Sequence, residues 1–105
     1  MKTAATSREE VIERCGQAEP DIRRLGVRRI ALFGSLARGE ANADSDVDLL
    51  VEFEPGGKSF DRFLALSDLL EHLLGRRVDL VTTEALSPHI GPHILAEAAD
   101  VVRAA

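Results

Sequence analysis

Three short segments of the chain have the composition or the alternation of apolar and polar residues that is typical of β-strands. Residues 27–33 (VRRIALF) are rich in β-branched and apolar side chains and end at Gly34. Residues 77–82 (RVDLVT) have the same character. Between them, residues 46–53 (DVDLLVEF) place apolar side chains at every second position, which predicts a strand with one buried side formed by Val47, Leu49, Val51 and Phe53.

The N-terminal part of the chain carries signals for two helices. Residues 7–10 (SREE) form a capping box, in which the Ser7 hydroxyl accepts from the Glu10 amide and the Glu10 carboxylate reaches back. We therefore expect a helix from near Ser7 that weakens around Gly16. Pro20 suits the first turn of a short second helix, and Gly26 suits its left-handed stop.

The C-terminal half predicts two further helices. Residues 54–58 form a turn, after which Ser59 can cap a helix that runs to about residue 74 and stops at Gly75. The apolar stripe of this helix consists of Phe63, Leu66, Leu70, Leu73 and Leu74. A last helix is expected to follow Pro92, with a buried side made of Ile94, Leu95, Ala98, Val101 and Val102.

The order of these elements predicts an α/β (α+β) fold in which helices flank a small β-sheet. The chain has 105 residues, so we expect one domain spanning residues 1–105. Its net charge of −5 (13 Lys+Arg against 18 Asp+Glu), with 45% hydrophobic and 30% charged residues, is typical of a soluble globular protein. The order of the three predicted strands within the sheet cannot be read from the sequence.

Composition also argues against several classes of function. No apolar run approaches the roughly 18 residues of a membrane helix, and the N-terminus lacks the apolar region of a secretory signal. A single cysteine, Cys15, fits a reducing compartment, so we expect a cytoplasmic protein without a membrane partner. The chain is acidic and contains four Phe but no Trp or Tyr, so direct nucleic-acid binding is not expected.

Three aspartates stand in otherwise apolar predicted strands. Asp46 and Asp48 are two residues apart and therefore leave the same face of one strand, and Asp79 lies in the middle of another. Like charges this close raise each other's pKa unless a cation intervenes, and Mg²⁺ prefers carboxylate oxygens. The three side chains are candidate metal ligands and catalytic groups. The alternative, which the residues alone leave open, is that they are solvated on an uncovered sheet face.

A candidate phosphate-binding turn follows the first predicted strand. Gly34 and Ser35 open a short helix whose backbone N–H groups and hydroxyl can donate to an anion. Arg38 lies one turn further along the same face and can reach a phosphate oxygen. Asp46 and Asp48 follow directly after Ser45, a short distance beyond this turn. We therefore expect a phosphate-binding turn and a metal-binding pair of acids side by side, as nucleoside triphosphate chemistry requires.

These motifs together resemble a known family. The stretch GSLARGEANADSDVDLLVEF resembles the Gly-Ser, Arg and Asp-x-Asp pattern of the DNA polymerase beta superfamily of nucleotidyltransferases, and RVDLVT supplies the family's third acid as Asp79. The small size and the ending SPHIGPHILAEAADVV are similar to the minimal nucleotidyltransferases, the MntA-type antitoxins of prokaryotes. The resemblance implies the nucleotidyltransferase fold, with a small mixed sheet flanked by helices.

The resemblance also implies a reaction, a cofactor and a partner. It implies transfer of AMP from ATP to a tyrosine hydroxyl of a HEPN ribonuclease toxin, with which the chain would form a complex. Asp46, Asp48 and Asp79 would be the catalytic residues and the ligands of two Mg²⁺ ions, with Asp79 nearest the attacking oxygen and the likeliest acceptor of its proton. The nucleotide-binding residues would be Gly34, Ser35, Arg38 and Ser45.

Two other functions stay open at the level of the sequence. The chain could neutralise a toxin by binding alone, because the predicted last helix has an apolar face. It could also be a nucleotidyltransferase for a small molecule, although such enzymes usually grip the acceptor with a second domain.

Overall fold

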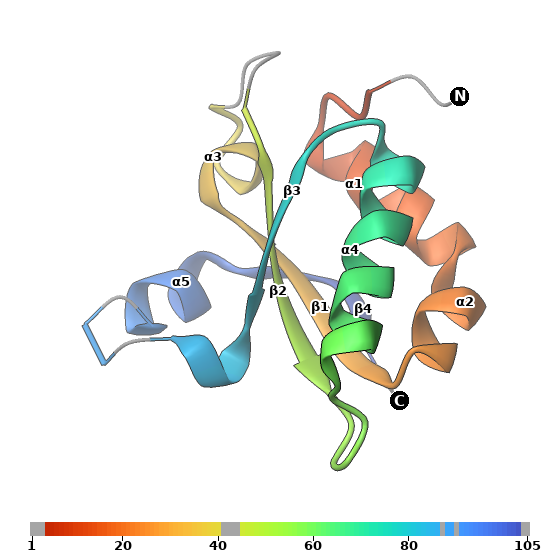
Figure 1. Ribbon diagram of the computed structural model, residues 1–105. Coiled ribbons are helices and arrows are strands. Elements are labelled where there is room, and N and C mark those ends of the chain that lie inside the picture. Colours follow the sequence, from red (N-terminus) through yellow and green to blue (C-terminus); the bar gives the residue numbers. More distant parts are fainter. Residues whose placement is uncertain (1–3, 41–44, 87, 90, 104–105) are drawn as a thin grey trace.

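The computed structural model describes residues 4–40, 45–86, 88–89 and 91–103. Its centre is a four-stranded sheet with the order β3-β2-β1-β4, in which β1 pairs antiparallel with both β2 and β4, and β2 pairs parallel with β3. The sheet is therefore mixed, as the family resemblance implied (Figure 1). The strands are β1 (Val27–Phe33), β2 (Val47–Phe53), β3 (Val78–Thr82) and β4 (Ala99–Arg103).

Helices lie on both faces of the sheet. Three of them pack together on one face: α1 (Arg8–Gln17), α2 (Glu19–Arg24) and α4 (Phe60–Leu74). The short helix α3 (Gly34–Ala37) follows β1 at one end of the sheet. The opposite face is only partly covered, by the 3-10 turn η1 (Thr83–Ala85) and the helix α5 (Gly91–Glu97). Within the described residues, no helix is long and apolar enough to cross a bilayer.

The predicted starts and stops of the first helices and of α4 are confirmed. The hydroxyls of Ser7 and Ser59 accept from backbone N–H groups in the first turns of α1 and α4, at 3.1 and 3.2 Å. Gly26 and Gly75 take the left-handed conformation after α2 and α4, with φ of 80° and 65°. The Glu10 carboxylate does reach back, and accepts from the hydroxyl of Thr6 at 2.7 Å.

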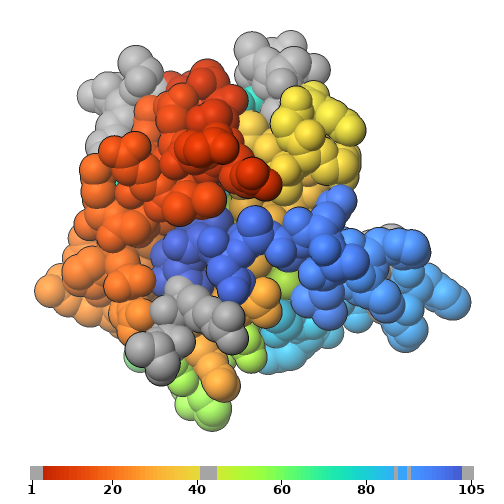
Figure 2. Space-filling view, turned by 180° about the vertical axis from the view of Figure 1, so that it is seen from behind, coloured from red at the N-terminus to blue at the C-terminus, as the bar shows by residue number. Residues whose placement is uncertain are grey.

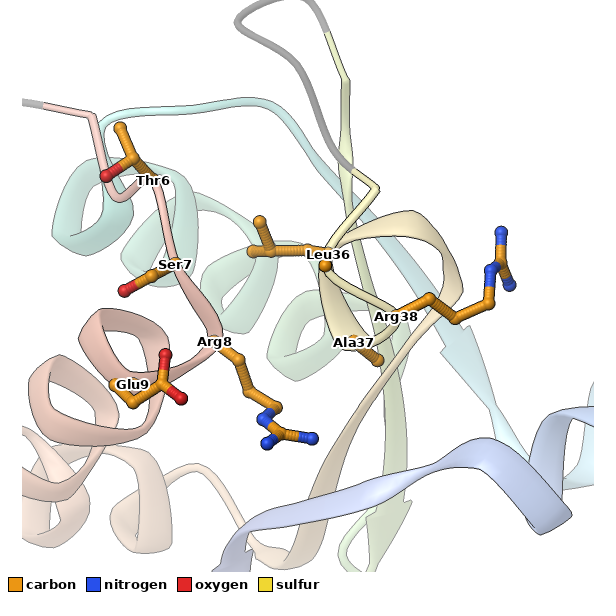
Figure 3. Close-up of a pocket in the computed structure, with 8 residues that line it drawn as sticks. Thr6, Ser7, Arg8, Glu9, Leu36, Ala37 and Arg38 are labelled. Carbon is orange, nitrogen blue, oxygen red and sulfur yellow. The ribbon is translucent and has the colours of Figure 1, made fainter.

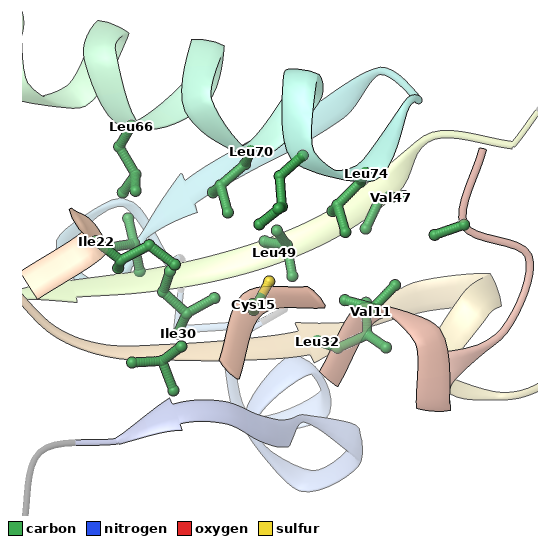
Figure 4. Close-up of a cluster of buried hydrophobic side chains, with 14 of the residues drawn as sticks. Val11, Cys15, Ile22, Ile30, Leu32, Val47, Leu49, Leu66, Leu70 and Leu74 are labelled. Carbon is green, nitrogen blue, oxygen red and sulfur yellow. The ribbon is translucent and has the colours of Figure 1, made fainter. Parts of the chain in front are cut away.

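The main core fills the space between the sheet and the helices α1, α2 and α4. The alternating positions of β1 and β2 face this core, together with the leucine stripe of α4, as the spacing predicted (Figure 4). Each fully buried aliphatic side chain contributes about 1.5–3 kcal/mol of transfer free energy. Cys15 of α1 is enclosed in the same cluster, and burial raises the pKa of its thiol to about 12. Its role is packing.

The end of the chain differs from the sequence-based expectation. One helix running from Pro92 through Val102 was expected; this is wrong, because α5 ends at Glu97 and β4 follows. The β-branched pair Val101–Val102 favours a strand, and β1 offers an open edge on which Val102 pairs with Ile30. As a result Val102 is buried in the main core at 2% exposure, whereas Leu95, assigned to the same buried face, is 49% exposed.

Candidate functional site

The turn that leaves β1 is shaped by Gly34. This residue has a φ of 77°, a conformation that side chains rarely allow, and it begins α3 immediately after the strand. A Cβ atom at Gly34 would lie 2.1 Å from Oδ2 of Asp48 on the neighbouring strand. Glycine is therefore required twice, once by the backbone conformation and once by the close approach of the Asp48 carboxylate.

The aspartates come together through the register of two parallel strands. Asp48 of β2 is the direct partner of Asp79 of β3, and paired residues in a parallel ladder point to the same face of the sheet. The neighbouring residues Val47 and Leu49 face the main core, so the carboxylates of Asp48 and Asp79 lie on the opposite, partly open face. Asp46 lies two residues before Asp48, just outside β2, and its side chain is 49% exposed.

This cluster of carboxylates is electrostatically unfavourable as it stands. Partial burial raises the pKa of the Asp48 carboxyl above its usual value, and the negative charges of Asp79 and Asp46 raise it further. Arg38 acts in the opposite direction but does not cancel these effects. A hard divalent cation would relieve the repulsion, and carboxylate oxygens are the ligands that such a cation prefers. Asp46, Asp48 and Asp79 are therefore of the residue type that suits a metal site. Their arrangement does not by itself form one, because no three His, Cys, Asp or Glu side chains among the described residues are grouped so that they could hold an ion.

The N–H group of Gly34 and the guanidinium of Arg38 both point to one acceptor, the carboxylate of Glu97. Gly34 N donates to Glu97 Oε1 at 3.0 Å, and Arg38 Nη1 donates to the two carboxylate oxygens at 3.2 and 3.0 Å. The Gly34 hydrogen bond and then the Arg38 hydrogen bond hold the pKa of Glu97 below its usual value. Arg38 also donates through Nε to Glu40 at 3.1 Å, and these two carboxylates raise its pKa. Two of the predicted phosphate donors thus do bind an anionic group here.

The sequence pattern gave no sign that Glu97 belongs to the site. It stands on the polar side of the predicted last helix, where a glutamate is ordinary, and its contacts are with residues about 60 positions earlier in the chain. No local pattern signals such a contact. Only the fold places Glu97 at this site, because it brings the end of α5 against α3; in Figure 2 the blue C-terminal part of the chain lies beside the yellow segment that contains the end of α3.

Arg76 binds the backbone of the segment that leads into Asp46. Its guanidinium donates to the carbonyl oxygens of Ser45 and, at 3.0 Å, of Ala5. The first amide of β2, from Val47, donates to the carbonyl of Arg77 at 2.9 Å, and the side chain of Arg77 lies 3.7 Å from Asp46. Ser45, predicted to bind the nucleotide, is therefore held by its backbone beside the first aspartate.

Ser35 lies in the first turn of α3, where its side chain is half-buried. Its carbonyl accepts from the Glu40 amide at 2.8 Å and closes the turn after α3. Ser35, Gly34 and Arg38 thus belong to one tightly folded segment at the end of β1.

A hollow of about 430 Å³ lies on the other side of α3, against the N-terminus of α1 (Figure 3). Arg8 extends toward it, whereas the side chain of Arg38 points away toward the open face of the sheet. The described residues that line it are Thr6, Ser7, Arg8, Glu9, Leu36, Ala37, Arg38 and Gly39. Its lining does not include the aspartates, so this hollow is not the carboxylate site, where Asp46 and Asp79 are exposed and Asp48 is half-buried.

A Gly-Ser turn at the end of one strand, beside carboxylates paired across two parallel strands, is the arrangement that the resemblance to nucleotidyltransferases implied. The family model described as "Nucleotidyltransferase domain" matches residues 9–100. The chain therefore belongs to the nucleotidyltransferase family, in its minimal, MntA-like branch, and it is an enzyme of that class.

Similar proteins place it in that branch. The curated "Protein adenylyltransferase MntA" of Thermococcus cleftensis is 51% identical over 74 residues, which cover 70% of this chain and 74% of the relative. A relative from Methanocaldococcus jannaschii, named "Putative protein adenylyltransferase MJ0435", is 42% identical over 83 residues, or 79% of this chain and 88% of the relative. A solved structure described as "Structure of putative minimal nucleotidyltransferase" superposes with a TM-score of 0.79 at 39% identity and covers 92% of this chain and 98% of its own.

More distant solved structures share the fold. One, described as a toxin-antitoxin complex with AMP-PNP, has a TM-score of 0.65 at 21% identity and covers 91% of this chain and 73% of its own. Another contains a tri-AMPylated HEPN toxin of Shewanella oneidensis in complex with its MNT antitoxin, with a TM-score of 0.55 at 20% identity and coverage of 85% and 72%.

Proposed function

We propose that this chain is the antitoxin of a HEPN/MNT toxin–antitoxin pair, and that it transfers AMP from ATP to a tyrosine hydroxyl of its HEPN ribonuclease partner. The observation that carries the proposal is the in-register pair of Asp48 and Asp79 beside the turn at Gly34. The names of the curated relatives support adenylyl transfer to a protein, and the toxin-antitoxin complexes with AMP-PNP and with an AMPylated HEPN toxin support the nucleotide and the partner.

In this proposal one group of residues binds the phosphates and another takes part in proton transfer. On one half of the site, the Gly34 N–H, the Ser35 hydroxyl and the Arg38 guanidinium bind the β- and γ-phosphates and stabilise the negative charge that develops on the departing pyrophosphate. On the other half, Asp79 accepts the proton of the attacking hydroxyl in this proposal. The oxygen of that hydroxyl forms a bond to the α-phosphorus while the bond from this phosphorus to the bridging oxygen breaks.

Asp46, Asp48 and Asp79 would hold two Mg²⁺ ions, which supply Lewis-acid stabilisation of the entering and leaving oxygens. Partial burial and the charges of Asp79 and Asp46 raise the pKa of Asp48, so a cation beside this carboxylate would stabilise its charged form. This supports the proposal that the cluster binds metal ions.

The acceptor must come from another molecule if it is a tyrosine, because the 105 residues contain none. The partly covered face of the sheet suits such an acceptor, since the side chains of Asp46 and Asp79 are exposed there.

The test is labelling of the toxin by this chain. The purified chain, α-labelled ATP, Mg²⁺ and the protein encoded by the neighbouring gene should yield AMP-tyrosine on that protein, identified by mass spectrometry. Asp48→Asn and Asp79→Asn should each lower the rate by about 100-fold or more. Asp68→Asn makes the same chemical change at an exposed position of α4 and should leave the rate unchanged. Undiminished labelling by either site variant would overturn the assignment.

Neutralisation by binding alone is a second candidate, favoured by the exposed Leu95 on the helix that carries Glu97. A chain with Asp46, Asp48 and Asp79 all changed to Asn distinguishes the two. Rescue of cells from the toxin by this variant, at matched expression, supports binding; loss of rescue with retained complex formation supports catalysis.

A further inference from the structure

The carboxylate of Glu97 occupies the place where the proposed function puts the phosphates. Gly34 N–H and Arg38 Nη1, two of the three proposed phosphate donors, are both directed at Glu97, at 3.0 to 3.2 Å. A carboxylate and a phosphate can bind the same donors, because each presents two negatively charged oxygens to a backbone N–H and a guanidinium. Glu97 therefore acts on these donors as an internal anion.

The two anions cannot share the N–H group of Gly34. A backbone N–H has a single hydrogen, so an oxygen of a phosphate on Gly34 replaces Glu97 Oε1. Electrostatic repulsion also disfavours binding of both anions at once. A phosphate on Gly34 would lie near two carboxylates, that of Glu97 and that of Asp48, which lies against the Gly34 Cα.

Glu97 is also free to leave. It is the last residue of α5, its side chain is 32% exposed, and its carboxylate accepts hydrogen bonds from Gly34 and Arg38. A change of side-chain rotamer moves its carboxylate into solvent without disturbing β4, whose residues pair with β1.

We propose that Glu97 is an internal competitor of the triphosphate: its carboxylate fills the Gly34–Arg38 anion site in the nucleotide-free chain, yields to the β- and γ-phosphates, and returns to displace pyrophosphate after transfer. This inference rests on the proposed function, since it assumes that Gly34 and Arg38 bind phosphates. It makes Glu97 a determinant of affinity for the triphosphate tail and for the pyrophosphate product, and it assigns Glu97 no contact with the base or the acceptor.

The test is direct binding of inorganic pyrophosphate, measured calorimetrically on the whole chain in buffer with Mg²⁺. Glu97→Gln keeps the size of the side chain and removes its charge, so the dissociation constant should fall about two- to fivefold, the range that a partly exposed ion pair can contribute. Glu40→Gln is the matched control, because Glu40 also pairs with Arg38, at 3.1 Å, but through Nε and without contact to Gly34. Its effect should be clearly smaller.

A second measurement follows the Gly34 amide by NMR. In the wild type, pyrophosphate should shift this resonance by exchanging one acceptor for another; in Glu97→Gln the resonance of the free chain should already differ. Melting temperatures of both variants establish that the fold is intact.

The outcomes separate the two claims. Equal or weaker pyrophosphate binding by Glu97→Gln, or an equal gain in Glu40→Gln, overturns the competitor role while the phosphate site stands. Absence of binding by the wild type and by both variants overturns the phosphate site itself, and the competitor role with it.

Discussion

The carboxylate of Asp48 lies directly against the Cα of Gly34, so close that a methyl group on Gly34 would come within 2.1 Å of Asp48 Oδ2. This contact joins the phosphate half of the site, at the end of β1, to the acidic half on β2. Phe33 and Asp48 are cross-strand partners, which places Gly34 just beyond the pair. The geometry of one half therefore depends on the other.

Substitution of Gly34 by alanine tests this contact. Both the clash and the φ of 77° act against a side chain, so Gly34→Ala should lower the free energy of unfolding by about 1–3 kcal/mol and abolish AMP transfer. The control is Gly16→Ala in α1, where a Cβ meets no atom within 4 Å; it should stabilise the chain by about 0.5–1 kcal/mol. Urea denaturation measures both values, and similar effects of the two changes would contradict the interpretation.

The acidic cluster should reduce the stability of the metal-free protein. Because the pKa of Asp48 is raised in the folded state, its ionisation at neutral pH favours the unfolded chain. Asp48→Asn should therefore raise the melting temperature in buffer with a chelator, by a few degrees at most, since solvent screens this half-buried group.

The same variant should respond differently to Mg²⁺. The ion should raise the melting temperature of the wild type by binding the folded state, and should have little effect on Asp48→Asn. Asp68→Asn, exposed on α4, should behave like the wild type in both conditions. A lower melting temperature of Asp48→Asn in chelator would show that the carboxylate stabilises the fold.

The identity of the last element can be tested with two substitutions seven residues apart. In a continuous helix Leu95 and Val102 would share a face and respond alike. In the structure Val102 is buried on β4 and Leu95 is exposed on α5. Val102→Asp should therefore cost more than about 3 kcal/mol, whereas Leu95→Asp should change stability by less than about 0.5 kcal/mol. Equal losses would favour the helix.

Cys15 should make stability fall in alkaline solution. Its pKa is raised to about 12 in the folded state from the ordinary 9.0, so between these values the unfolded chain binds fewer protons and the free energy of unfolding decreases as pH rises. The loss should reach about 1 kcal/mol near pH 10. Urea titrations from pH 8 to 10 measure the slope, and Cys15→Ala should remove this part of it. A thiol reagent at pH 8 should label the wild type only after denaturation.

Local signals made much of the fold predictable. The strand of residues 27–33 and the α4 helix have the boundaries that the sequence indicated, because each is bounded by residues with strong turn or capping preferences, such as Gly34, Ser59 and Gly75. The three candidate aspartates could be singled out because acids are rare in strands. Their roles remain predictions for the labelling experiment.

What escaped prediction depends on contacts between distant residues. The segment of Val101 and Val102 has the apolar content of either a helix or a strand, and the free edge of β1 decides between them. The parallel register that aligns Asp48 with Asp79 joins two strands that are separated in the sequence by the whole of α4, so no local spacing determines it. Glu97 has no local signature at all.

The parallel pairing of β2 with β3 also places the candidate catalytic residues at one end of the sheet, away from its opposite end. The aspartates stand where β2 begins, while the Pro55–Gly57 turn closes its other end, at the bottom of Figure 1. A fluorophore or an affinity handle grafted into that distal turn would leave the chemistry untouched. One extra residue between α4 and β3 that shifts the register of β3 by one position would instead turn Asp79 to the opposite face of the sheet and abolish activity.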